Sequence, residues 1–274
     1  MAADPRVTPL RPDLAASSLE GRIAADRYAD PAPMQTRLPV AGLRYEPART
    51  AELADQLLFG ELFDVLDSQD GWVWGQARRD GYVGWVRLEA LSAEIFAPTH
   101  RVSALRAFAF SEPGFKTLPV GRYSMNALVA VEAEDDRYLK LAGSGWMVRE
   151  HLAPIGTTED DPVAVAERYL DTPYLWGGRD SHGLDCSGLV QQALYACGQA
   201  CPRDSDQQAA ALGRKLGGAE TLQRGDLVFW PRHVGVMVDS QRLLHANSHH
   251  MATVIEPLEA HIARAGPVIA RKRL

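Results

Sequence analysis

The hydrophobic pattern of this chain changes at one point, and the change limits the folds open to it. Before residue 157, short apolar runs alternate with turn residues, as in RLPVAGLRYEP, LLFGELFDVLD and GWVWGQARRDGYVGWVRLEAL. Such alternation is typical of strands in small barrels. After the polar segment 157–162, apolar residues recur at helical spacing, which predicts an opening helix over residues 162–170. The pattern predicts a multidomain chain that is first all-β and then α+β.

The first part contains a predicted hairpin and a repeated strand ending. Residues 72–76 and 82–87 flank the pair Asp80-Gly81, whose glycine supplies the positive φ of a hairpin turn. The stretch GYVGWVRLEAL (81–91) has a counterpart in GSGWMVREHL (143–152), each a Gly-Trp strand before a predicted 3₁₀ turn. A repeat of this kind indicates two copies of one small fold.

Four segments follow from these patterns. Residues 1–34 are predicted to be an N-terminal extension, with a short helix at 13–20, and residues 35–94 and 97–155 to be two small barrels. Residues 160–274 are predicted to form a third, α+β domain. A length of 274 residues fits about two domains of ordinary size, or three when small β modules are counted.

The composition excludes several classes of partner. A net charge of -6 and a pI near 5.8 argue against a nucleic-acid-binding protein, and the basic tail Arg271-Lys272-Arg273 is expected to be solvated. No apolar run is long enough for a membrane span, and the first residues lack the apolar stretch of a signal peptide, so a cytoplasmic protein is expected. Three cysteines form an odd set, which fits a reducing compartment better than a disulfide framework.

A glycine-rich loop runs into an amphipathic helix at Cys186. Unpaired backbone N–H groups and the helix dipole are expected to stabilise a thiolate at that position, which is the nucleophilic form. Cys197 falls in the apolar stripe of the same helix and is expected in the core, whereas Cys201 is interpreted as a surface or packing thiol. The two lack further ligands for a zinc site, and neither a metal nor a cofactor is predicted.

Two histidines downstream are candidates for the base that a thiol nucleophile needs. His233 opens the apolar run VGVMV after GDLVFW, so the two runs are predicted to be antiparallel strands joined at Pro231-Arg232. His245 is predicted to end a short strand at Leu243-Leu244. The order Cys, GDLVF, HVGV, LHA is unexpected in a protein whose function lies elsewhere.

These motifs resemble the NlpC/P60 cysteine peptidases, papain-like enzymes that cut bacterial peptidoglycan peptides. The resemblance covers residues 160–274 and rests on YLWGG (174–178), DCSGLV (185–190), GDLVF (225–229), HVGV (233–236) and HA (245–246). It implies Cys186 as nucleophile, His233 as general base and then acid, and His245 as the group that orients His233.

The same resemblance implies further roles near the nucleophile. The Tyr174 hydroxyl is a candidate to stabilise the oxyanion with the backbone N–H of Cys186, the alternative being plain loop packing. Asp185 and Ser187 flank the nucleophile and imply binding of a substrate α-amino group, and Trp176 belongs to the same substrate-binding loop. Residues 202–208 are the usual loop-to-helix segment near the cleft, or simply a helix capped by Ser205 or Asp204. The remaining histidines are expected to be solvated: His182, His249, His250 and His261.

The repeated Gly-Trp ending is similar to bacterial SH3 (SH3b) domains, which are often fused to cell-wall enzymes. An NlpC/P60 domain behind SH3b domains resembles the cytosolic γ-D-glutamyl-L-diamino acid endopeptidases that recycle muropeptides. In those enzymes an SH3b glutamate and tyrosine help to hold the free amine of the substrate's L-Ala, and Glu61 and Tyr82 are the closest counterparts here. Whether these barrels shape the substrate cleft or merely pack against the enzyme stays open.

Two other functions remain possible at this point. Related papain-like folds carry out acyl transfer or amide hydrolysis on other small substrates, although no membrane-binding stretch favours a lipid. A non-catalytic wall-binding protein is disfavoured by the intact set of cysteine and histidines. The sequence does not decide between meso-diaminopimelate and lysine after the scissile bond, nor the oligomeric state.

Overall fold

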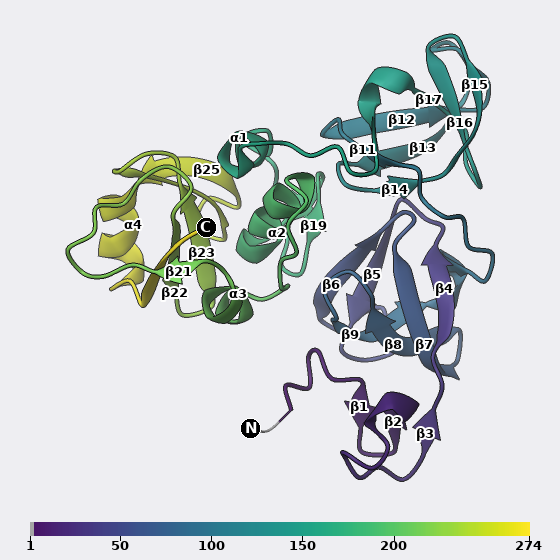
Figure 1. The fold of residues 1–274 in the computed structure, drawn as a ribbon, viewed down its shortest axis with the longest axis horizontal. Helices are drawn as coiled ribbons and strands as arrows, with labels where there is room; N and C mark the ends of the chain where they lie inside the picture. Colours follow the sequence, from purple (N-terminus) through teal and green to yellow (C-terminus); the bar gives the residue numbers. More distant parts are fainter. Residues whose placement is uncertain (1–2) are drawn as a thin grey trace. The chain divides into compact units, whose positions relative to one another are not determined.

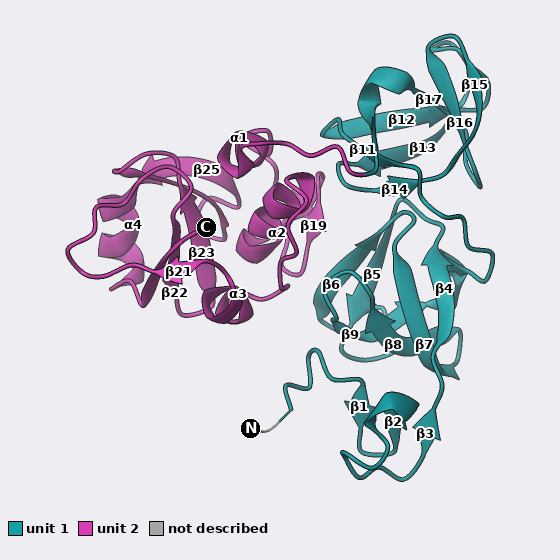
Figure 2. Ribbon diagram, in the orientation of Figure 1, with its two compact units in different colours: residues 1–155 teal, residues 156–274 magenta. Residues whose placement is uncertain are grey.

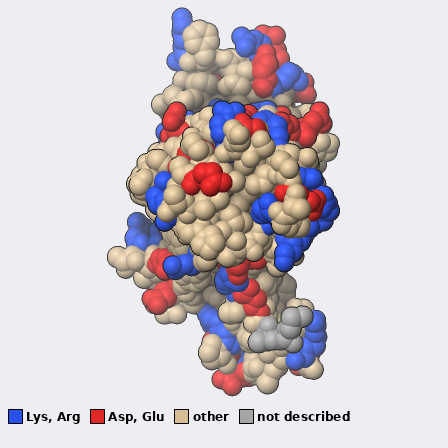
Figure 3. All heavy atoms as spheres, turned by 90° about the vertical axis from the view of Figure 1, so that its left-hand side faces the viewer, with Lys and Arg blue, Asp and Glu red and all other residues tan. Residues whose placement is uncertain are grey.

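The computed structural model describes residues 3–274, which divide into two compact units, one up to Ile155 and one from Gly156 (Figures 1 and 2). Within residues 3–274, no helix has both the length and the apolar character needed to cross a membrane. On the face drawn in Figure 3, basic and acidic side chains are interspersed around a largely uncharged centre.

The N-terminal extension forms strands where a helix was expected. A three-stranded sheet of order β1-β2-β3 contains β1 (Leu10–Arg11), β2 (Leu14–Ala16) and β3 (Tyr28–Ala29), and a 3₁₀ turn covers Ser17–Leu19. The predicted helix at residues 13–20 is therefore wrong. All three residues of β2 are buried, and their backbone groups pair with β1 and β3, so tertiary pairing outweighs a helical pattern of only eight residues.

The next segment folds into a seven-stranded antiparallel sheet. Its order is β10-β4-β7-β8-β9-β5-β6, with β4 (Ala32–Thr36), β5 (Val40–Arg44), β6 (Leu53–Leu58), β7 (Leu62–Gln69), β8 (Trp72–Ala77), β9 (Val83–Arg87) and β10 (Leu91–Ser92). The predicted hairpin is confirmed, because β8 pairs with β9 and Gly81 has a φ of 82°. A 3₁₀ turn at Leu88–Ala90 follows β9, also as predicted.

The last part of the first unit contains two further sheets. One has the order β14-β11-β18, formed by β11 (His100–Val102), β14 (Leu128–Val129) and β18 (Leu152–Pro154). The other has the order β13-β12-β17-β16-β15, formed by β12 (Arg106–Phe110), β13 (Pro119–Ser124), β15 (Val131–Asp135), β16 (Tyr138–Leu141) and β17 (Trp146–Val148). The predicted 3₁₀ turn after β17 is present at Arg149–His151.

The second unit is α+β. Its six-stranded sheet has the order β21-β26-β22-β23-β24-β25, with β21 (Arg214–Lys215), β22 (Leu227–Trp230), β23 (His233–Met237), β24 (Arg242–Asn247), β25 (Ala252–Pro257) and β26 (Ala270–Arg273). The helices are α1 (Pro162–Glu167), α2 (Cys186–Ala196), α3 (Ser205–Ala211) and α4 (Leu258–Ala265), and β19 (Arg179–Asp180) pairs with β20 (Gly183–Leu184).

Two details of this unit correct the expectations. His245 lies inside β24 and does not end a strand, because β24 continues to Asn247 through its pairing with β25. Cys197 is the half-exposed C-cap of α2, whereas Cys201 is the buried thiol, at 3% exposure. The capping of α3 by Asp204 is confirmed, as part of a capping box with Gln207.

Candidate active site

The candidate nucleophile is held at the first turn of α2. Asp185 is the N-cap of this helix, and its carboxylate accepts a hydrogen bond from the Gly188 N–H at 2.8 Å. Cys186 follows it and is 6% exposed. Burial, followed by the charge of Asp185, raises the pKa of the Cys186 thiol to about 12, although the N–H groups of Val234 and Ser187 act in the opposite direction. The expected helix-end effect is therefore present but outweighed, and the resting group is a thiol.

The carboxylate of Asp185 holds the loop and the helix end together. It lies 2.6 and 2.9 Å from two nitrogens of Arg203, and it accepts hydrogen bonds from the Gly177 N–H and the Ser187 hydroxyl. The side chain of Arg203 is 1% exposed. A buried carboxylate with this many donors fixes the backbone around it.

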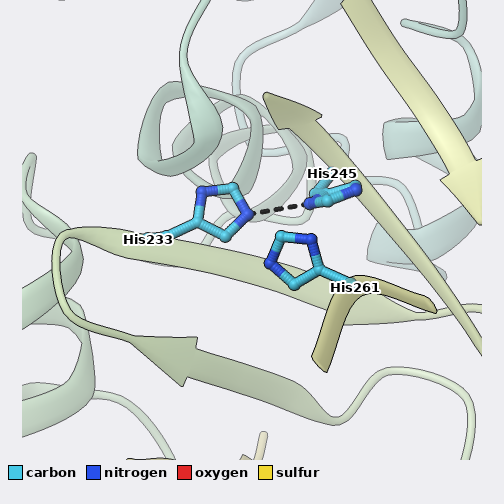
Figure 4. Close-up of side chains that lie close together, drawn as sticks. All are labelled: His233, His245 and His261. Carbon is cyan, nitrogen blue, oxygen red and sulfur yellow. Dashed lines mark hydrogen bonds between the residues drawn. The ribbon is translucent and has the colours of Figure 1, made fainter. Parts of the chain in front are cut away.

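The candidate base and its partner come from two neighbouring strands. His233 begins β23, and His245 lies in β24, which pairs with β23. The Nε2 of His233 lies 2.8 Å from the Nδ1 of His245 (Figure 4). A Cβ built on Gly235 would lie 2.7 Å from the Cδ1 of Leu243 and 3.1 Å from the Cβ of His245, so a glycine lets the two strands approach closely there. The backbone N–H of Val234 bonds the Cys186 thiol, so the nucleophile lies against the beginning of β23.

Glu256 determines which nitrogens carry the protons. Its Oε1 lies 2.8 Å from the Nε2 of His245. Burial raises the pKa of Glu256, but the Arg264 guanidinium and His245 outweigh burial and hold this pKa at about 2. The ionised carboxylate can only accept a hydrogen bond, so the Nε2 of His245 must donate it. The Nδ1 of His245 then accepts the proton on the Nε2 of His233.

This assignment leaves the Nδ1 of His233 as a free base. In Figure 4 that nitrogen points away from the other two histidines. The Nδ2 of Asn247 also lies 3.0 Å from the Nε2 of His245, but two donors do not bond each other, so this contact is not a hydrogen bond in the assigned tautomer. The carboxylate contact is shorter and charge-assisted, and it decides the tautomer.

Both imidazoles are neutral at physiological pH. Burial, followed by the neighbouring His245, lowers the pKa of His233 to about 3, and burial, followed by His261, lowers the pKa of His245 to about 4. With the thiol also protonated, the resting pair is uncharged. Such a pair works by general-base catalysis, in which the proton leaves the sulfur as it attacks.

His261 corrects a prediction. It was expected to be solvated, but it is 5% exposed and stands edge-on to Trp230, with ring centroids 4.5 Å apart. Its ring lies 5.0 Å from that of His233 and 4.6 Å from that of His245, and burial lowers its pKa. The reason is α4, which folds back beside β25 and brings a sequence-distant histidine into the site. His249 and His250 are exposed as predicted, and His182 is half-buried.

The three imidazoles also have the spacing of metal ligands. One nitrogen from each lies within 4.8 Å of the others. However, His233 and His245 share one proton between the facing nitrogens, and the Arg264 guanidinium stands 3.1 Å from the Nδ1 of His261. The arrangement fits a proton relay.

Comparisons with known proteins identify two domains in this chain. Residues 171–265 match the NlpC/P60 family, and residues 43–91 match the family described as "Bacterial dipeptidyl-peptidase Sh3 domain". Residues 171–265 form an NlpC/P60 domain. A crystal structure of an NlpC/P60 family protein from Bacillus cereus has the same fold, with a TM-score of 0.76 at 19% identity over 88% of this chain and 99% of that one.

Curated relatives extend over most of the chain. A Bacillus subtilis protein named gamma-D-glutamyl-L-lysine dipeptidyl-peptidase is 29% identical over 70% of this chain and 71% of its own length. Dipeptidyl-peptidase 6 of Lysinibacillus sphaericus is 26% identical over 76% of this chain and 85% of its own length. The chain is a peptidase in which an SH3 domain precedes the NlpC/P60 domain.

The other predicted site residues of the NlpC/P60 domain differ in burial and in their contacts. Burial, followed by the proximity of Cys186 and Asp185, raises the pKa of Tyr174, so its hydroxyl keeps its proton and remains a donor. Ser187 is 5% exposed and bonds Asp185 and Arg203, whereas Trp176 is 50% exposed.

The two predicted residues of the SH3 domain are buried within the first unit. The carboxylate of Glu61 lies 2.7 Å from the Nη1 of Arg79 and accepts a hydrogen bond from the Leu58 N–H. The Tyr82 hydroxyl lies 2.9 Å from that of Tyr45.

Three residues at the site carried no recognised signal in the sequence. Arg203 lies in the segment 202–208, which was interpreted as a segment near the cleft or as a capped helix, with no role predicted for Arg203 itself. Glu256 and His261 follow the motif region, on β25 and α4. Strand alternation places Glu256 on the same face of β25 as Val254, which is directly opposite His245, and this register is the signal that finds it once the pairing is known.

Proposed function

We propose that this chain hydrolyses the bond between γ-D-glutamate and the following diamino acid in cell-wall peptides that carry a free N-terminal L-Ala. The observation that carries the proposal is the relay from Glu256 through His245 to His233, beside a thiol at a helix N-terminus. The names of the relatives, which cover 70% and 76% of the chain, support the choice of substrate class.

Cys186, His233 and His245 are the proposed catalytic group. The Nδ1 of His233 takes the thiol proton while the Cys186 sulfur bonds the carbonyl carbon. The backbone N–H of Cys186 and the Tyr174 hydroxyl stabilise the oxyanion. The carbon–nitrogen bond then breaks as His233 returns the proton to the leaving amine, and water, deprotonated by the same nitrogen, hydrolyses the thioester.

Recognition of the substrate amine is proposed for a second set of residues. In this proposal the ammonium group is held by carboxylates and nearby polar groups, as a charged group entering a partly closed site requires. The set is Asp185, Ser187, Trp176, Glu61 and Tyr82.

We also infer that residues 97–155 are a second SH3b-like barrel, supported by the repeated strand and 3₁₀ ending of residues 81–91 and 143–152. The proposed physiological role is recycling of murein peptides in the cytoplasm. The free state of Cys186, Cys197 and Cys201 supports a reducing compartment.

One observation favours a second function, a general peptidoglycan endopeptidase. The carboxylates of Asp185 and Glu61 are both paired with arginines, at 2.6 and 2.7 Å. A carboxylate already paired binds an incoming ammonium group less strongly. In this alternative the enzyme does not recognise the free amine of the substrate.

One experiment separates the two functions. L-Ala-γ-D-Glu-meso-diaminopimelate and its N-acetylated form are incubated with the enzyme, and products are followed by mass spectrometry. The proposed function requires that acetylation lower kcat/KM by about 100-fold or more, because it removes the charge and adds bulk. Comparable cleavage of both peptides, or of intact peptidoglycan, identifies the general endopeptidase instead. Under the proposed function, Glu61→Gln should reduce the ratio of kcat/KM between the free and the acetylated peptide.

A further inference from the structure

A pocket of about 680 Å³ opens beside His233, entirely within the second unit. Its wall includes Trp176, Trp230, Arg232, His233, His261 and Arg264. This volume lies in the range of small-molecule sites, about 300 to 1,000 Å³. The wall also includes Tyr174, and the mechanism above uses only His233 and Tyr174 from it.

The position of the pocket identifies the half of the substrate that it holds. Its wall includes the candidate base His233, whereas Cys186 and Asp185 are not among the wall residues. During acyl transfer the acyl half is attached to the sulfur, and the leaving half departs from beside the imidazole that protonates it. Tyr174 and Trp176, assigned above to the oxyanion and to the substrate amine, form the part of the wall shared with the acyl half. His233 and its neighbour Arg232 form the part on the leaving-group side, where the diamino acid lies.

The charges on the wall are basic. Arg232 and Arg264 contribute guanidinium groups, and no aspartate or glutamate of the described chain lies on this wall. Arg264 is already the counter-ion of Glu256. Arg232 is exposed and, among residues 3–274, it enters no side-chain hydrogen bond or ion pair.

The backbone presents Arg232 toward the site at some conformational cost. Pro231 and Arg232 form the two-residue connection between Trp230 and His233, which pair across the hairpin. Arg232 has a φ of 60°, a conformation that favours glycine and is unfavourable for other residues by roughly 1 kcal/mol. The short turn fixes the backbone of Arg232 one residue from the candidate base.

We infer that this pocket binds the diamino acid after the scissile bond, and that Arg232 selects a side chain ending in a carboxylate. Lysine ends in an ammonium group alone, whereas meso-diaminopimelate ends in both a carboxylate and an ammonium group. A guanidinium binds carboxylates through paired hydrogen bonds and repels a lone ammonium. The inference rests on the proposed function, and it distinguishes this chain from the relatives whose names specify lysine.

The test compares kcat/KM for L-Ala-γ-D-Glu-meso-diaminopimelate and L-Ala-γ-D-Glu-L-Lys. The full-length enzyme should prefer the diaminopimelate peptide by about five- to tenfold, as expected for a charge-assisted contact at a partly exposed site. Arg232→Gln should bring the ratio close to one through loss on the diaminopimelate peptide alone. Arg232→Lys should keep most of the preference, and Arg232→Glu should reverse it.

The matched control is Lys215→Gln. Lys215 is an exposed cation of the same unit that does not line this pocket, so its removal should leave the ratio unchanged. Equal cleavage of both peptides by the unaltered enzyme overturns the inference. Equal loss on both peptides in Arg232→Gln also overturns it, because Arg232 would then bind a carboxylate common to both. Cleavage of neither peptide is a separate result, which overturns the proposed function itself.

Discussion

The two halves of the candidate site differ in how their residues are distributed along the sequence. On the nucleophile side, Asp185, Cys186 and Arg203 lie within 18 residues and meet at one helix end. On the base side, His233, His245 and Glu256 lie on three successive strands, separated by 12 and 11 residues. A helix cap fixes the first half, whereas the register of β23, β24 and β25 fixes the second.

Each half is supported by a carboxylate–arginine pair, and the two pairs differ in exposure. The side chains of Arg203 and Asp185 are 1% and 9% exposed, whereas those of Arg264 and Glu256 are 31% and 11% exposed. Disruption of a sealed pair leaves a buried charge, which destabilises the fold. Disruption of a pair that reaches solvent destabilises the fold less. For Arg264 and Glu256 the effect should therefore appear mainly in the pKa values of the histidines and in the catalytic rate.

The largest expected effect is on the nucleophile itself. Cys186→Ala should lower kcat by at least about 10⁴-fold, because removal of the attacking group abolishes the covalent pathway. Circular dichroism and thermal unfolding should show an intact fold. Cys197→Ala is the control, since this half-exposed cap residue lies outside the site. Turnover of Cys186→Ala close to that of the unaltered enzyme would contradict the assignment.

The buried Asp185–Arg203 pair should be more important for stability than the Glu256–Arg264 pair. Arg203→Met removes the partner of the buried Asp185 carboxylate, and it should lower the free energy of unfolding of the NlpC/P60 domain by about 3 to 5 kcal/mol. Urea unfolding measures this change. Arg214→Met removes the cation of the exposed pair with Glu220 and should leave the unfolding curve in place. Equal shifts for the two variants would show that burial of the Asp185–Arg203 pair has no special effect.

On the base side, His233 and His245 should differ. His233→Ala should lose nearly as much activity as Cys186→Ala, because it removes the group that transfers the proton. His245→Gln should lose about 10- to 100-fold, since an amide oxygen still accepts the proton on the Nε2 of His233. Steady-state kinetics with the tripeptide measures both. If the two variants lose the same activity, His245 does more than orient its neighbour.

The sequence predicted the nucleophile half more completely than the base half. The loop and helix around Cys186 are encoded by adjacent residues, so the helix start and its apolar stripe could be placed, although the capping by Asp185 was not predicted. Arg203 was missed because its contact with Asp185 depends on how a loop folds back over the helix. Glu256 and His261 were missed because only strand pairing and the position of α4 bring them close to His245. The segment 13–20 was predicted wrongly for a similar reason, since its strand depends on pairing with other segments.

Glu256 offers the most sensitive test of the base half. His233 is active when neutral, so kcat/KM is present above its pKa and is lost as the pH falls through it. Because burial lowers that pKa to about 3, the acid limb should lie well below the usual value of 6.5 for histidine. Glu256→Gln keeps an acceptor for the Nε2 proton of His245 but removes a charge that raises the pKa of both His233 and His245. It should therefore lower kcat by only about tenfold.

The direction of the pH shift then separates two explanations. Loss of the charge alone makes His233 less basic, so the acid limb of Glu256→Gln should move to lower pH. Looser packing would instead hydrate the imidazoles and move the limb up toward 6.5. Long-range ¹H–¹⁵N spectra of the histidine rings should show the tautomer of His245 unchanged in Glu256→Gln and mixed in Glu256→Ala, where the acceptor is lost. A limb that moves upward in Glu256→Gln would show that Glu256 supports packing and does not tune the base.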